Sequence, residues 1–104
     1  MKLAEIDIVL AAKVAEYMAL ARDLRSDSPI EDYRRANCLA WELAMCLPAD
    51  IFRSIGKALT KRSAECNEHT VAIAVRALLL GDDAGNLTAN ELISHAPGIG
   101  KPKN

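Results

Sequence analysis

A cysteine and a histidine one helical turn apart are the first residues in the chain whose spacing could support chemistry. Cys66 and His69 are three positions apart, so on a helix they would share a face and could both bind a metal ion. A structural zinc site needs four such ligands, and nothing else in the sequence is obviously placed to supply the others. We therefore predict no metal and no cofactor, and we interpret Cys38, Cys46 and Cys66 as unpaired thiols within helices.

Residues 80–91 contain half of a calcium-loop pattern, with Gly85 and Glu91 at its sixth and twelfth positions. Calcium takes six to eight oxygen ligands in proteins. Leu80 and Ala84 stand at the first and fifth positions of the loop, where the pattern requires oxygen-bearing side chains. We therefore interpret the segment as a turn that leads into a capped helix.

Residues 92–101 resemble the first half of a helix-hairpin-helix motif, because the run from Pro97 to Gly100 matches the hairpin of that family. The resemblance implies that the glycine amides of the hairpin approach a DNA phosphate. No second helix follows the hairpin in this sequence, so half of the fold that would hold these amides in place is missing. We therefore do not predict DNA binding through this hairpin.

Arg62 and His69 are separated by six residues, a spacing that resembles the Arg–His pair of helical HEPN-type ribonucleases. The resemblance implies that the pair acts on RNA across a dimer interface. The residue after the arginine is Ser63, whereas asparagine is most typical of that family. We predict that the protein is not an enzyme, and a helical ribonuclease stays an alternative function.

The elements that would position these residues belong to one small domain. The chain has 104 residues, of which 51% are hydrophobic and 26% charged, and its net charge is −1. Two domains of this total length would each be too small to form a core. We predict a single helical domain over residues 1–96 and a flexible C-terminal tail over 97–104. No stretch reaches the ~20 apolar residues of a membrane span, and residues 1–15 do not resemble a signal peptide, so we expect a cytoplasmic protein.

Hydrophobic periodicity predicts an all-α fold, a small bundle of four main helices plus a short C-terminal helix. The first helix covers residues 3–25. The second begins at a predicted capping box, with Ser28 as N-cap, a proline at the first helical position and Glu31 at the third. Its core-facing stripe is expected to begin at Ile30, with Trp41 beside it.

Residues 49–80 contain no proline, and their one glycine lies inside the third predicted helix. Neither residue type therefore marks a boundary between a third helix and a fourth. The face that is apolar at Ile55 nevertheless becomes polar at Arg62, so one straight helix would turn its core face to water. A break at Asn67, which is a competent N-cap, removes the conflict. The fourth helix then covers about 68–80.

Two of the predicted helices have more apolar surface than a single copy of the chain can bury. The first has only a narrow polar line, and the fourth is apolar on nearly every side, whereas a surface helix is usually polar over much of its circumference. An extra apolar stripe marks an interaction surface. We therefore predict a homodimer, with an interface that contains Ala11, Ala15, Met18 and Ala19.

The third helix has a basic row on the side opposite its apolar residues. Arg53, Lys57 and Lys61 recur at every fourth position, and residues 51–64 contain no acidic residue. We predict that this row binds another protein, and that the chain acts as a small regulator, adaptor or inhibitor through helix-mediated association. Nucleic-acid binding through the basic 53–62 segment is the alternative, although a few cations without interleaved aromatic residues favour weak phosphate binding at best.

Overall fold

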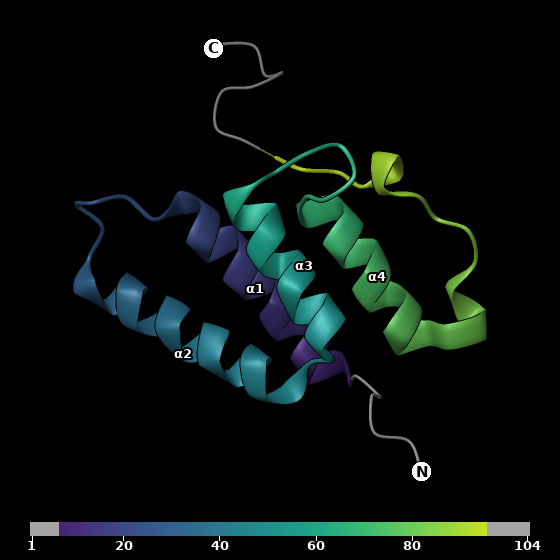
Figure 1. The fold of residues 1–104 in the computed structure, drawn as a ribbon, viewed down its shortest axis with the longest axis horizontal. Coiled ribbons are helices and arrows are strands. Elements are labelled where there is room, and N and C mark those ends of the chain that lie inside the picture. Colours follow the sequence, from purple (N-terminus) through teal and green to yellow (C-terminus); the bar gives the residue numbers. More distant parts are fainter. Residues whose placement is uncertain (1–6, 96–104) are drawn as a thin grey trace, which may run out of the picture.

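The computed structural model describes residues 7–95, which form one bundle of four α-helices (Figure 1). The helices are α1 (Ile8–Asp23), α2 (Ile30–Cys46), α3 (Ala49–Thr60) and α4 (Glu68–Leu80). Two 3-10 turns follow, η1 (Gly81–Ala84) and η2 (Ala89–Glu91). The prediction of an all-α bundle is confirmed, and the described residues contain no strand. The short C-terminal helix is only the 3-10 turn η2.

Some predicted features fall outside the described part of the chain. These are the start of the first predicted helix before Asp7, the hairpin between Pro97 and Gly100, and the tail over 97–104. Within the described part, no helix is both long and apolar enough to cross a membrane.

The helices are arranged around α1 and α3, which lie between α2 on one side and α4 on the other (Figure 1). Neighbouring helices share one core, and α2 and α4 do not touch each other. The side chains buried in this core are Val14, Met18, Leu43, Leu47, Ile51, Ile55, Ala58, Val71 and Val75. The buried residues of each helix lie three or four positions apart, so each helix buries only one face.

The predicted break between α3 and α4 is confirmed. The Asn67 side-chain oxygen accepts hydrogen bonds from the backbone N–H groups of His69 (2.9 Å) and Thr70 (3.1 Å). The Thr70 hydroxyl in turn accepts from the Asn67 backbone N–H at 2.9 Å, which completes a capping box. The helix ends at Gly81 with φ of +57°, a conformation that glycine adopts without steric cost.

The predicted capping box of the second helix is wrong. α2 begins at Ile30, and no side chain caps it. Ser28 instead closes the preceding turn, where its hydroxyl accepts from the Arg25 backbone N–H at 2.8 Å and its own N–H donates to the Arg25 carbonyl at 3.0 Å. A serine hydroxyl engaged in this local turn is not available to the helix.

The side of α2 that faces the core also differs from the prediction at its N-terminal end. Ala36, Leu39 and Leu43 are buried, but Ile30 is 59% exposed and Trp41 is 66% exposed. The helix therefore has a second apolar face that points away from the core.

The Asn67 cap gives a direct test of the break. We expect Asn67→Ala to lower the free energy of unfolding by about 1–2 kcal/mol, because the first backbone N–H groups of α4 lose their acceptor. The measurement is urea denaturation followed by circular dichroism. Asn86→Ala changes an exposed loop residue and should cost less than about 0.5 kcal/mol. Equal effects of the two substitutions would contradict the assigned cap.

Candidate functional site

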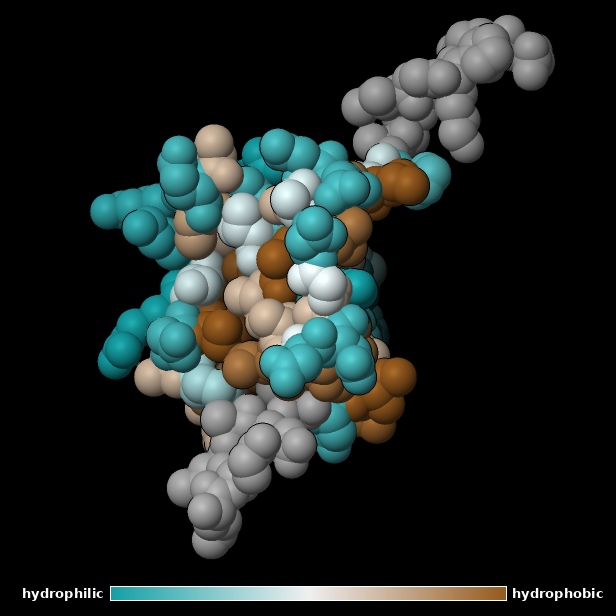
Figure 2. All heavy atoms as spheres, turned by 90° about the vertical axis from the view of Figure 1, so that its right-hand side faces the viewer, coloured by the Kyte–Doolittle hydropathy of each residue, from teal (hydrophilic) through white to brown (hydrophobic). Residues whose placement is uncertain are grey.

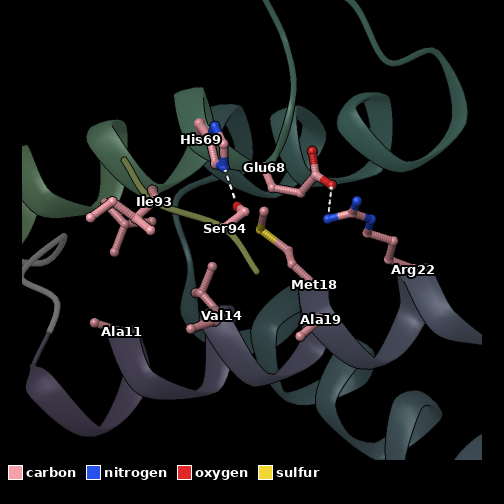
Figure 3. A pocket seen from close by; sticks show the side chains of 12 residues that line it. Ala11, Val14, Met18, Ala19, Arg22, Glu68, His69, Ile93 and Ser94 are labelled. Carbon is pink, nitrogen blue, oxygen red and sulfur yellow. Dashed lines mark hydrogen bonds and ion pairs between the residues drawn. The ribbon is translucent and has the colours of Figure 1, made fainter. Parts of the chain in front are cut away.

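A groove between α1 and α4 is lined by all four residues that were predicted from the sequence to form a dimer interface. Its cavity has a volume of about 470 Å³. The lining from α1 includes Ala11, Ala15, Met18 and Ala19, and α4 contributes Ala72 and Val75. Figure 3 shows the labelled α1 side chains facing those of α4 across this space. The structure thus brings these predicted residues together in one concave surface.

The groove is concave because of the side chains that the two helices contribute. Ala11, Ala15 and Ala19 recur at every fourth position of α1, so they form one low wall of the groove. Met18 and Val75 are 5% exposed and belong to the core. The floor of the groove is therefore the outer side of the core itself.

The chain after η2 closes one part of the groove. Ile93 lines the cavity and is nevertheless 81% exposed. The neighbouring Ser94 hydroxyl lies 2.7 Å from Nε2 of His69 in a hydrogen bond that holds this segment against α4 (Figure 3). Figure 2, which views α4 and the chain after it, shows apolar atoms exposed between polar ones on this side of the molecule.

A cluster of ionised side chains forms the polar end of the groove. The Glu68 carboxylate, whose side chain is 15% exposed, lies 3.2 Å from Nη1 of Arg22 and 2.7 Å from Nε of Arg62. Burial by itself raises the pKa of Glu68, but the hydrogen bonds from Arg62 and the backbone, together with the two arginine charges, lower it more. The pKa of this carboxyl therefore lies below its ordinary value.

Arg62 and His69 have different partners in this structure. Arg62 donates to Glu68, and the His69 ring is hydrogen bonded to Ser94. Among the described residues, no hydrogen bond joins the arginine to the histidine. The geometry therefore gives no specific support to a ribonuclease pair.

The other residues whose spacing suggested metal binding, Cys66 and Glu91, form hydrogen bonds within the fold. The Cys66 thiol donates to the Ser54 carbonyl at 3.4 Å. Glu91 accepts from the backbone N–H and the hydroxyl of Thr88, and these bonds lower the pKa of its carboxyl. In residues 7–95, no three His, Cys, Asp or Glu side chains are close enough together to hold a metal ion.

The basic row of α3 lies apart from the groove. Arg53, Lys57 and Lys61 are all exposed, and none of them lines the cavity. Arg53 and Lys57 are on the side of α3 opposite Ile51 and Ile55, which are buried, whereas Lys61 is the C-cap residue after the last helical residue, Thr60. The row is thus a second, separate polar surface that faces solvent.

Two charged side chains of α1, Lys13 and Glu16, pair with residues of α2. Arg35 makes two hydrogen bonds to the Glu16 carboxylate, at 2.9 and 2.8 Å, and the Arg35 hydrogen bond lowers the pKa of Glu16. Lys13 pairs with Glu42 of α2. These pairs leave the groove side of α1 apolar apart from Arg22.

One exposed apolar surface, the outer face of α2, was not predicted from the sequence. Trp41 and Met45 are 66% and 78% exposed and lie one helical turn apart. Their spacing was visible in the sequence, but α2 is apolar on two faces. Hydrophobic periodicity alone did not show which of these two faces would pack against the core.

No protein-family model, curated protein or solved structure matches this chain. The function is therefore inferred from the surfaces of the molecule alone.

The ion pairs of Glu68 predict that the wild type and a Glu68 variant differ in stability, and that this difference depends on pH. Glu68→Gln should lower the free energy of unfolding at neutral pH by about 1–2 kcal/mol, because two arginines lose a charged acceptor. Since the folded-state pKa of Glu68 is lowered, its contribution is complete above the pKa of the unfolded chain and disappears as the pH falls through the folded pKa. Urea denaturation over a pH series measures the difference between the wild type and the variant. A difference that persists unchanged into strong acid would contradict this account.

Proposed function

We propose that the protein is a binding module for other proteins, which acts as a small regulator, adaptor or inhibitor. The α1–α4 groove is the proposed binding site, and it holds one amphipathic helix of the partner. The observation that carries the proposal is the apolar cavity of about 470 Å³ at the surface, which the helices within residues 7–95 leave unfilled. Contiguous exposed apolar surface of this kind is typical of interaction sites.

A helix suits the groove in both length and chemistry. From Ala11 to Arg22 the α1 wall extends for about 16 Å at the helical rise of ~1.5 Å per residue, which is three turns of a partner helix. Small wall residues allow a third helix to approach closely, and its large aliphatic side chains at the first, fourth or fifth, and eighth positions would enter the cavity. The Arg22–Glu68 pair then forms a polar rim at one end.

The charges around the groove favour an apolar partner surface over a polyanion. Glu68 is neutralised by arginines, and Lys13 and Glu16 are paired with α2. Of the charged side chains that line the cavity, Arg22 and Glu68 balance each other, and Arg62, which also pairs with Glu68, adds one positive charge at that end. The exposed row of Arg53, Lys57 and Lys61 offers a phosphate backbone three cations in sequence without an acidic residue between them.

Nucleic-acid binding through the 53–62 segment is the second candidate function. It is favoured by the exposure of Arg53 and Lys57 on one side of α3 and of Lys61 at its C-cap. Binding of this kind weakens steeply with salt, because cations on DNA or RNA are released. The same row also suits an acidic protein surface.

A displayed library of amphipathic helical peptides tests the proposed function. We expect selected peptides to bind the wild type and to bind Ala15→Glu about tenfold more weakly or worse, because the new carboxylate stands on the groove wall. Lys57→Glu is the matched control, since it places the same carboxylate on an exposed helical position outside the groove. Fluorescence anisotropy of labelled peptides measures both affinities.

Two results would contradict the groove as the binding site. One is peptide affinity that Ala15→Glu leaves intact while Lys57→Glu abolishes it. The other is an absence of helical binders combined with salt-sensitive binding of RNA or DNA that Lys57→Glu removes, which would establish the second candidate instead.

A further inference from the structure

We propose that the outer face of α2 binds a second copy of this chain, with the two α2 helices packed antiparallel about a twofold axis. This inference is independent of the groove and of what the groove binds. The surface, called here the α2 stripe, consists of Ile30, Arg34, Asn37, Cys38, Trp41 and Met45.

All six residues of the α2 stripe are exposed. At about 100° per residue, their positions fall within a sector about 100° wide, on the opposite side of the helix from Leu39 and Leu43. Ile30 is 59% exposed, Trp41 66% and Met45 78%, so three large apolar side chains stand in water on one face. An exposed tryptophan flanked by aliphatic side chains is the usual anchor of a protein interface.

The α2 stripe is complementary to itself when the second copy runs in the opposite direction. Its positions are symmetric about a point between Asn37 and Cys38. An antiparallel pair in this register sets Ile30 against Met45 of the second copy, and Arg34 against Trp41 of the second copy. By symmetry each contact forms twice, as a twofold interface requires.

Charge favours this antiparallel arrangement over a parallel one. Arg34 is the only ionisable side chain of the α2 stripe with a permanent positive charge, and a guanidinium is attracted to the face of an indole ring. A parallel twofold pair would instead place Arg34 against Arg34 of the second copy. The neighbouring Arg35 and Glu42 are already paired with α1 and do not compete.

The shape of the molecule also directs a second copy to α2 rather than to α1. The residues of α1 predicted at a dimer interface line a concave groove, and two concave surfaces placed face to face leave space between them. The outer side of α2 lies on the opposite side of the bundle from α4, which forms one side of the groove (Figure 1). A dimer through α2 therefore leaves both grooves accessible.

The size of the contact sets the expected affinity. One helix of 17 residues covers less than the ~800 Å² per partner of a standard stable interface. We therefore expect a reversible dimer that forms in the micromolar range rather than a permanent one.

Cysteine cross-linking tests the register directly. In the antiparallel pair the two Cys38 residues flank the twofold axis, offset by about 1.5 Å along the helices, whereas two Cys46 residues are about 25 Å apart. Single-cysteine proteins that retain only Cys38, Cys46 or Cys66 are treated with a short bis-maleimide at high micromolar concentration. We expect a cross-linked dimer from the Cys38 protein and not from the other two, although Cys46 is also exposed.

Sedimentation velocity with two charged variants completes the test. Trp41→Glu alters an exposed residue, so the fold should persist by circular dichroism, and we expect the dimer to weaken about tenfold or more. Ala15→Glu, on the groove wall, should leave the dimer unchanged. Cross-linking through Cys46, a dimer that resists Trp41→Glu but is lost with Ala15→Glu, or a wild-type protein that stays monomeric at these concentrations would each overturn the proposal.

Discussion

One cluster of buried side chains holds all four helices together, and each helix contributes only one face to it. α1 buries Val14 and Met18, and α4 buries Val71 and Val75. Both helices have further apolar side chains outside these positions. Burying that apolar surface away from water would be favourable by about 25 cal/mol per Å². Between residues 7 and 95 there is no fifth α-helix to cover it. The apolar excess therefore lies open to water as the groove.

The burial of Leu39 and Leu43, which are both 0% exposed, determines which face of α2 is left outside. In that orientation Arg35 and Glu42 reach across to Glu16 and Lys13 of α1. Exposed pairs of this kind add little to stability. The rotation that buries the two leucines turns Trp41 and Met45 to solvent.

Sequence reasoning succeeded where the deciding interactions are local. The break at Asn67 and the end of α4 at Gly81 depend on side chains and dihedral angles within one helical turn. It failed at Ser28, where a competing turn engages the hydroxyl, and at Ile30 and Trp41, because contacts with α1 choose between two apolar faces of α2. The groove residues of α1 were recognised from periodicity, but the concave shape depends on how far α4 lies from α1.

The central claim is that the apolar faces of one copy stay outside its own core. Solvent paramagnetic relaxation enhancement, recorded by NMR on a sample dilute enough to be monomeric, measures this most directly. The account predicts strong enhancement for the side-chain protons of Ile93, Trp41 and Met45, and weak enhancement for those of Leu43 and Ile55. If the first three were as protected from the probe as the last two, the chain would cover its own apolar surface and the proposed interaction sites would not exist.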